Sequence, residues 1–596
     1  THRATITLLG DKSVAPTVVG REGHTLSSKS LIVGGNLTLY GQPRSRWTRL
    51  AATAAAGDGV ITLQGGDVNW GVNDTIVIAS TSFDPSQAET RVVAAVAPHP
   101  AAGTTTVTLD APLRYRHFSG VEAAGTRSMA MRAEVGLLSH NIVVQGEDNG
   151  DDIGGQVFIG EYSRDVWRCA KLPCTPGFVQ TLAGHAQVHH VELRRLGQFG
   201  REGRAAVVFQ APAGGALSSF SDSSLHTVWN RGFYVPTGDG VTVERVTIVD
   251  TVGSCVYVGR GATRAVLRDN LAMGMAFPAT YRGVPSNVQT EPVRADFEVW
   301  GAGARLHGNA AAGSERGGFA GIGMPFCGAS EAEKAAVMSR NVAHSCLIGW
   351  FSHRLGGAGC SALHGLTIYK ALNYGVFWEN RQHVELSAVA VADTKVGIAM
   401  ILVGPGPSRR ARLEGTMSDV LLVGASANEE CGLPRPAPHM CLNRKAHCKN
   451  PNAPHVGLFI PTFAGGFNAG PHIHEWTSGD TYPAIEGDAW LRGVTFSKFG
   501  VSCGGRRNFM MAHNPQQPDA SGPLHVADVE VVASDVDSYI RIAPPSAGWV
   551  ALDDCVDMDC MGPKHVFVED ADGSMLGGDG GYFLPAAEYI SPPAVA

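Results

Sequence analysis

The sequence has no long apolar run and few charges. No stretch of 18 or more consecutive apolar residues is present, and the first residues lack the charged-then-apolar pattern of a secretion signal, so we expect neither a membrane span nor a signal peptide within these 596 residues. Only 17% of the residues are charged, and the net charge is −7. This gives no electrostatic reason to expect nucleic acid or an anionic membrane as a partner.

The sequence also lacks any C-x-x-C motif, although it has 12 cysteines. The closest pairs, Cys169 with Cys174 and Cys555 with Cys560, each have four residues between them. We expect each pair to form a local disulfide, which indicates an oxidising compartment. The alternative is a zinc site, which the missing C-x-x-C spacing disfavours.

Two glycosylation sequons agree with an extracellular location. They begin at Asn36 and at Asn73. An N-linked glycan needs a surface position in a secreted chain, so both asparagines are expected to be exposed.

Glycines recur at a nearly constant interval between short, strand-like segments. Gly232, Gly253 and Gly274 are 21 residues apart, and Gly375 and Gly397 are 22 apart. A repeat of this length with two-residue alternation predicts a β-solenoid, with the three glycines stacked on successive coils. A β-sandwich is the alternative, but its turns would not recur at this interval.

Alternation within one coil predicts which side chains enter the bore. Four apolar residues are expected to point inward and the polar residues between them to face water: Val241, Val243, Val246 and Ile248 against Thr242, Glu244, Arg245 and Thr247. We expect Val246 and Ile248 to lie on a coil next to that of Val256 and Tyr257. The similar contexts of Asn270, Asn309 and Asn341 predict stacked amides at a coil corner.

Three parts follow one another along the chain. Residues 1–135 are rich in strands and glycine, residues 136–500 carry the coils, and residues 501–596 are expected to form a small β-rich cap over the last coil. Residues 405–470, rich in Pro, Gly and Cys, are expected to form a disulfide-pinned insertion.

The segment GGNLTLYG from Gly34, the run Trp47-Thr48-Arg49-Leu50 and the run WGVNDTIVIASTS from Trp70 lie in a window with eight glycines. This window resembles the eight-glycine (G8) domain of the fibrocystin-like family, which includes hyaluronan-binding and hyaluronidase members. Residues 140–147 and 191–261 are similar to that family's parallel β-helix, residues 309–315 and 341–345 to its later coils, and residues 570–574 to its closing segment. The resemblance implies an all-β protein, with a partial G8 domain, a right-handed parallel β-helix and a cap, at the cell surface or cilium.

The resemblance also identifies positions for a catalytic site. Relatives associated with hyaluronan cleavage carry histidines and an acidic pair on one face of the helix. This sequence has Val208, Gln210, Pro236 and Ser254 at the histidine positions, and Gly259 and Arg260 at the acidic positions. None of these residues transfers a proton near neutral pH, so we expect no catalytic residues of the family type.

Other clusters leave alternatives open. Strand alternation puts His190 and Glu192 on one face and His189 on the other, so with His185 they are not expected to converge on a metal. The acidic segments 147–152 and 553–559 are calcium candidates, with solvated turns as the alternative. Five aromatic residues would mark a glycan-binding face if they align, and core packing if they do not: Trp229, Tyr234, Tyr257, Trp350 and Trp378.

These observations predict a non-catalytic, extracellular structural or adhesive protein. It would be a rigid rod in a cell-surface or ciliary coat, part of a larger protein or assembly, binding neighbouring proteins or glycans with no cofactor, calcium being the one candidate. The alternatives are a hyaluronidase-like, polysaccharide-cleaving enzyme and a glycan-binding module without catalysis.

Overall fold

A computed structural model gives the three-dimensional structure of the chain. It describes residues 2–10, 17–19, 24–26, 29–168, 175–210, 218–276, 294–402, 413–429, 431, 455–461, 487–503, 505–513, 524–535, 540–543, 565–585 and 587–590.

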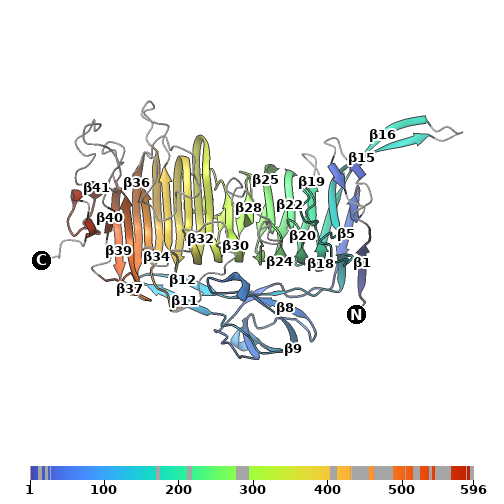
Figure 1. Ribbon diagram of the computed structural model, residues 1–596, viewed down its shortest axis with the longest axis horizontal. Helices are drawn as coiled ribbons and strands as arrows, with labels where there is room; N and C mark the ends of the chain where they lie inside the picture. The colour runs from blue at the N-terminus through green and yellow to red at the C-terminus, as the bar shows by residue number, and fades with distance from the viewer. Residues whose placement is uncertain are drawn as a thin grey trace.

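The coils stack into a parallel β-helix, which confirms the predicted fold class (Figure 1). One coil consists of β23 (Thr242–Glu244), β24 (Thr247–Thr251) and β25 (Val256–Thr263). Each of these strands pairs in parallel with a strand of the preceding coil and one of the following coil. The coil therefore has three faces, and each face belongs to a different run of strands.

The face of β24 is made by β1 (Ala4–Leu8), β14 (Ile142–Gly146), β18 (Val191–Leu196), β21 (Ser224–Val228), β27 (Leu271–Met273), parts of β30 (Ala310–Gly321) and β32 (Asn341–Ala392), β34 (Glu414–Val423), β36 (Asp488–Ser497), β39 (Leu524–Val532) and β41 (His565–Asp570). The face of β25 is made by β4 (Ser30–Val33), β15 (Gln156–Arg168), β19 (Val207–Gln210), β22 (Phe233–Asp239), β28 (Ala295–Val299), other parts of β30 and β32, β33 (Val396–Leu402), β35 (His455–Pro461), β38 (Gly505–His513) and β40 (Ile540–Ala543). The face of β23 is made by β5 (Asn36–Tyr40), β17 (His185–His189), β20 (Ser219–Ser221), β26 (Val266–Arg268), β29 (Arg305–His307) and β31 (Met338–Ser339).

The number of residues in a coil differs from the interval between the glycines. Gly232 precedes the Phe233–Val256 pair and therefore lies beside Cys255, not Gly253, so the predicted stack of three glycines is wrong. Ser224 pairs with Thr247, 23 positions later, and Thr247 pairs with Leu271, 24 positions later. The 21-residue interval joins glycines at different corners because the coil is longer than that interval.

Two further expectations about neighbouring residues have different outcomes. Gly375 and Gly397 do lie on adjacent coils, and a Cβ on Gly375 would come 2.4 Å from the carbonyl oxygen of Gly397, so glycine is needed at this close approach. Val246 and Val256 lie on one coil, not on neighbouring coils, because β24 and β25 follow each other around the same turn.

The predicted inward residues are buried in the bore. Val241, Val243, Val246 and Ile248 all belong to the continuous apolar core. Thr247 is the exception among the outward residues, since it is 2% exposed. Gly136 approaches its methyl group so closely that a Cβ there would be 2.6 Å away, which shows that another part of the chain covers this face.

That cover is a domain inserted into the solenoid. β1, β4 and β5 pair in parallel with β14, β15 and β17, so these three strands already form the first coil. The predicted boundary at residue 135 is replaced by an insertion between β5 and β14. The insertion contains the six-stranded sheet of β6 (Thr48–Arg49), β7 (Val60–Gln64), β8 (Thr75–Ile78), β9 (Glu89–His99), β10 (Thr104–Leu109) and β13 (Glu134–Leu137).

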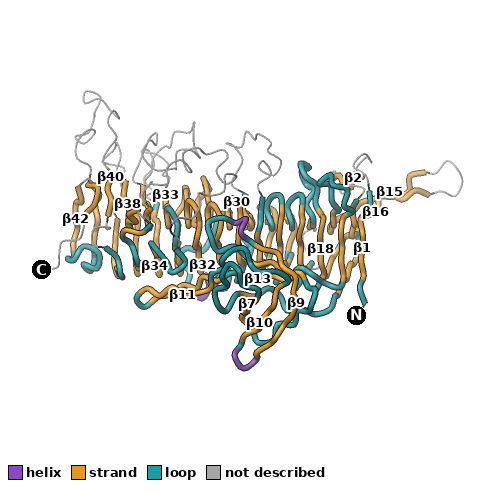
Figure 2. Tube along the Cα trace, turned by 60° about the horizontal axis from the view of Figure 1, so that its bottom comes forward, coloured by secondary structure: helices purple, strands orange, loops and turns teal. Residues whose placement is uncertain are grey.

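A hairpin extends the insertion along the flank of the solenoid (Figure 2). It is formed by β11 (Ser119–Ala124) and β12 (Arg127–Arg132). Met129 and Met131 pack with Tyr369 and Leu421 of later coils. The insertion therefore lies against many coils and braces them.

The coils continue beyond the predicted boundary at residue 500. β39 and β41 extend the face of β36 in parallel. Among the described strands of this region, three antiparallel pairs depart from the coil pattern: β37 (Val501–Ser502) with β38, β41 with β42 (Gly580–Pro585), and β40 with β43 (Ala587–Ile590). Within the predicted 405–470 insertion, β34 and β35 are also coil strands. Coil strands separated by long connections do not show the short repeat that identifies a solenoid in sequence.

Few elements are helical. The one described α-helix, α2 (Glu331–Ala335), begins with a capping box between Ser330 and Glu333. Among the residues that the structure describes, no helix is both long and apolar enough to cross a membrane.

Candidate functional site

The positions that match the family's histidines lie on the β25 face or at its corner. Val208 is 5% exposed and packs on the outer surface with Phe158 and Ala205, beside Tyr234. Ser254 is fully buried and donates a hydrogen bond to Glu298. Pro236 lies at a register shift between β19 and β22, which fits a residue without a backbone N–H.

Two tyrosines and a glutamate form a row across three coils of this face. Tyr234 is in register with Tyr257, and their rings stack with centroids 5.1 Å apart. Tyr257 is in register with Glu298. The guanidinium of Arg231 lies over both rings, 5.3 Å from the centroid of Tyr234 and 5.1 Å from that of Tyr257. Two of the five aromatic candidates, Tyr234 and Tyr257, therefore align on one face of the solenoid.

The electrostatics of this row do not favour proton abstraction by a tyrosine. Burial raises the pKa of Tyr257, and Tyr234 and Glu298 raise it further. The phenol therefore stays protonated at neutral pH, where it can donate a hydrogen bond but is a poor general base.

A cleft adjoins the row at the corner that leads into β22 and β25. It has a volume of about 330 Å³ and is lined by residues 199–202, 229–231, 252–253 and Arg294. We call it the arginine cleft, because Arg201, Arg231 and Arg294 line it against one acidic residue, Glu202. Arg294 pairs with Glu298 at 3.7 Å and so joins the cleft to the row of tyrosines.

The other aromatic candidates divide into two kinds. Trp350 and Trp378 are buried in the bore with 1% exposure each, so they are core residues. Trp229 is half-buried and lines the arginine cleft. Sequence reasoning identified Trp229 and the tyrosines but missed Arg231, Arg294 and Glu298, because nothing in their local sequence distinguishes them from other surface charges.

The histidines of residues 185–190 do not gather around a metal. His189 bonds to Ser221 and stacks on Tyr40, with the ring centroids 4.7 Å apart. His190 has φ +56° at a coil corner, which breaks the strand alternation that would have placed it beside Glu192. A different histidine, His226, contacts Glu192 at 3.3 Å.

Glu192 is held by several donors beside the inserted domain. Burial opposes its ionisation, but the hydrogen bond and charge of His226, the backbone N–H of His140 and Arg194 lower its pKa below the usual value. Burial also lowers the pKa of His140, to about 4. A neutral imidazole and a paired carboxylate indicate a structural cluster here.

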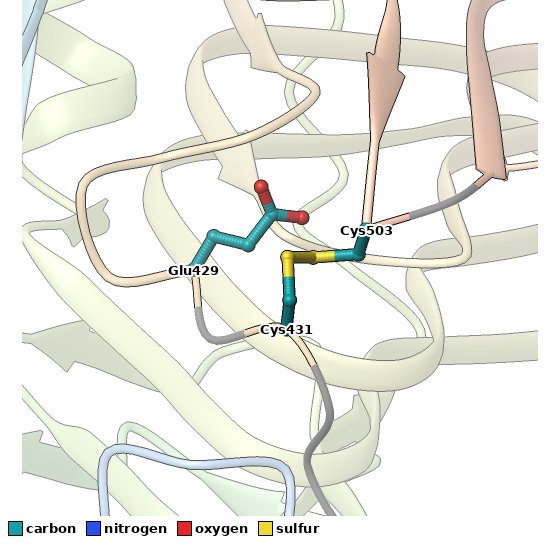
Figure 3. A group of neighbouring side chains, drawn as sticks. All are labelled: Glu429, Cys431 and Cys503. Atoms are coloured by element: carbon teal, nitrogen blue, oxygen red, sulfur yellow. A yellow bond between two sulfur atoms is a disulfide. The ribbon is translucent and has the colours of Figure 1, made fainter.

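One group of possible ligand atoms is brought together elsewhere in the described ranges. Glu429, Cys431 and Cys503 have their ligand atoms within 4.8 Å of one another. Figure 3 shows that the two sulfur atoms are joined in a disulfide, so they are not available as thiolates. The carboxylate of Glu429 pairs with Arg507. This group is therefore a crosslink between coils.

The calcium candidates differ in what can be said of them. In the segment 147–152, Asp148 pairs with Arg195 at 3.6 Å and Asp151 accepts a hydrogen bond from the backbone of Ile153. These contacts are those of a surface turn. The segment 553–559 lies outside the described residues.

The predicted modification sites are only partly described. Asn36 on β5 and Asn73 in the inserted domain are both exposed. Cys169, Cys174, Cys555 and Cys560 lie outside the described residues. Two disulfides are present among the described residues, Cys327–Cys360 and Cys431–Cys503. They join residues 33 and 72 positions apart, which no spacing rule could have paired.

Comparisons with known proteins agree with this architecture. Residues 177–350 match the family model of the CEMIP beta-helix, and residues 1–51 match that of the G8 domain. The chain is 30% identical to Fibrocystin-L of Mus musculus over 98% of its own length and 14% of that protein's length. It is 26% identical to Fibrocystin of Canis lupus familiaris over 91% of its own length and 12% of that protein's.

A solved structure is similar in outline only. The A-module of mannuronan C-5 epimerase from Azotobacter vinelandii superposes with a TM-score of 0.29 at 12% identity, covering 67% of this chain and 88% of that module. A likeness this weak carries no argument about function.

The chain spans about one seventh of Fibrocystin-L, to which nearly all of it aligns. The resemblance read from the sequence is thereby confirmed: the chain is similar to Fibrocystin-L and Fibrocystin over most of its own length.

Proposed function

We propose that this chain is a non-catalytic, extracellular segment of a cell-surface coat, a rigid rod that binds neighbouring proteins or glycans. The observation that carries the proposal is the outer side of the β25 face. At and beside the positions of the family's histidines it presents Val208, Tyr234 and Tyr257, none of which exchanges a proton near neutral pH.

The braced architecture supports a mechanical role. The inserted domain is bound to distant coils by polar contacts as well as apolar ones: Trp47 Nε1 donates to the carbonyl of Asp269, and Lys498 pairs with Glu122. These partners lie far apart along the rod. A brace that contacts several coils resists bending between them.

An extracellular location is supported by the crosslinks and sequons. Two disulfides join segments of the described chain, and such bonds persist in oxidising compartments. Both sequon asparagines are exposed, as glycosylation requires.

The competing function is cleavage of a polysaccharide by Glu298. This carboxylate lies on the same face, but it is 1% exposed and is bound by Ser254 and Arg294. A general acid or nucleophile must reach the glycosidic oxygen or the anomeric carbon, and a second carboxyl group is normally placed within about 5–10 Å of it. The buried, paired state of Glu298 supports a positioning role for it.

The test is incubation of the purified chain with fluorescent high-molecular-weight hyaluronan, with and without calcium, followed by measurement of chain length. A known hyaluronidase serves as the positive control. We expect no shortening. Depolymerisation that disappears in Glu298→Gln or in Glu192→Ala, but persists in Glu202→Gln, would overturn the proposal.

A further inference from the structure

We propose that the arginine cleft binds sulfated sugar units; this rests on the glycan-binding part of the proposed function and assigns it a site and a ligand class. The cleft has a volume of about 330 Å³, which lies within the range of roughly 300–1,000 Å³ typical of small-ligand sites.

The cleft has an excess of positive charge. Arg201 is exposed, and within the described ranges neither it nor Arg231 pairs with a carboxylate. Arg294 adds a third guanidinium, which pairs with Glu298, and Glu202 adds one negative charge to the lining. Unpaired guanidinium groups in a concave site attract anions, and their planar fork fits two oxygens of one oxyanion.

Arg231 is held in position before any ligand binds. Its guanidinium is fixed over the stacked rings of Tyr234 and Tyr257, and its Nε is buried without a hydrogen-bond partner. A side chain that is already ordered loses less conformational entropy when it binds a ligand.

The loop that carries Arg201 is tied to the same corner. The Nδ2 of Asn230 donates to the carbonyls of Gln198 and Arg201, both at 2.8 Å, and its Oδ1 accepts the backbone N–H of Arg231 at 2.7 Å. One asparagine therefore sets the distance between the two unpaired arginines.

The rest of the lining suits a sugar ring. Trp229 and Phe199 line the cleft beside the arginines, and flat aromatic rings pack against the C–H faces of pyranoses. An unsulfated uronic-acid disaccharide carries one negative charge, whereas a sulfated disaccharide carries two or more in a similar volume. Three arginines around one cleft match a sulfated disaccharide better than an unsulfated one.

The experiment measures binding of size-matched hexasaccharides to the purified chain by calorimetry. The set contains heparin, chondroitin sulfate, chemically desulfated heparin and hyaluronan. We expect the sulfated hexasaccharides to bind more tightly than the other two, with affinity that falls as salt is raised. Replacing Arg231 or Arg201 by Gln should weaken that binding about tenfold, the effect of one charge-assisted hydrogen bond.

The control is Arg260→Gln, which removes an exposed arginine in the middle of β25 that does not line the cleft. It should leave the affinity unchanged, and thermal melting confirms that each variant is folded. Arg201 is exposed, so Arg201→Gln tests the cleft even if Arg231→Gln fails to fold.

Two outcomes would overturn the proposal: no preference for sulfated ligands, or equal losses in Arg201→Gln and Arg260→Gln, which indicates non-specific charge attraction. Either result leaves the structural rod intact. Shortening of hyaluronan would instead overturn the non-catalytic function without bearing on the cleft.

Discussion

The Nδ2 of Asn270 donates a hydrogen bond to the Oδ1 of Asn309 on the next coil at 3.0 Å, and neither side chain is exposed to solvent. Asn309 donates in turn to Oδ1 of Asn341, also at 3.0 Å. The predicted stack of amides is thus present over three coils. Each of these asparagines also donates to a backbone carbonyl, so the buried amides are satisfied.

Replacing Asn309 by alanine should destabilise the rod. The change leaves the side-chain amide and backbone N–H of Asn270 and the carbonyl of Leu267 without their partner. Because unsatisfied buried groups are costly, we expect the free energy of unfolding in urea to fall by about 2–4 kcal/mol. Asn149→Ala, in an exposed loop, is the control and should have no effect. Equal stability of the two variants would show that the stacked amides of Asn270, Asn309 and Asn341 do not stabilise the rod.

The native protein should resist thiol labelling at Cys255 and Cys346. Both are buried, and burial raises the pKa of each thiol, so little reactive thiolate forms. Alkylation followed by mass spectrometry should modify them only in urea. Cys327, Cys360, Cys431 and Cys503 should be labelled only after reduction.

The same experiment tests the disulfides predicted for Cys169 with Cys174 and Cys555 with Cys560. Each pair should be recovered as one crosslinked fragment before reduction. Labelling of these four cysteines in the unreduced protein would reject that prediction.

The contact between the inserted domain and the coils should weaken in acid. The carboxylate of Glu134 on β13 is fully buried between Nε2 of His344 at 2.8 Å and Nε of Arg49 at 2.9 Å. Burial opposes its ionisation, but the charges and hydrogen bonds of His344 and Arg49 bring its pKa below the usual 4.5. A carboxyl with a lowered folded-state pKa stabilises the fold above its unfolded pKa and loses that contribution as the pH falls toward the folded one.

We therefore expect stability to decline below about pH 4.5. Glu134→Gln should be less stable than the unchanged protein at pH 7 by about 3 kcal/mol, the cost of breaking a buried pair, and the gap should narrow in acid. Urea unfolding between pH 3 and 7 measures this, with the exposed Glu414→Gln as the control. A constant gap across that range would show that the ionisation of Glu134 is not involved.

Expression in a mammalian secretory pathway should attach glycans at Asn36 and Asn73, since both are exposed. Treatment with peptide N-glycosidase should then increase electrophoretic mobility in two steps. Asn36→Gln and Asn73→Gln should each remove one step. A single step in the unchanged protein would show that one sequon is unused.

Much of the coil could be predicted because alternation is a local property. Val243 enters the bore because it alternates with the polar residues Thr242 and Glu244 along its strand. The prediction that three glycines stack was wrong for a physical reason. The register between coils depends on the total length of each coil, and the lengths of the corners vary. No single residue type marks the same corner in every coil. Trp350 and Trp378 show the same limit, because the sequence does not distinguish an aromatic in the bore from one on the surface.

The all-β solenoid, the resemblance to fibrocystin-like proteins and the stack of asparagine amides could be predicted from the sequence, because strand alternation and recurring motifs are properties of neighbouring residues. Three features became known from the folded chain: β1, β4 and β5 form the first coil, Gly136 covers Thr247, and Arg201, Arg231 and Arg294 line one cleft. Stacking brings together residues one or more coils apart, and the inserted domain covers coils more than 100 positions away. Such contacts depend on how whole elements pack together, and a short stretch of sequence does not predict them.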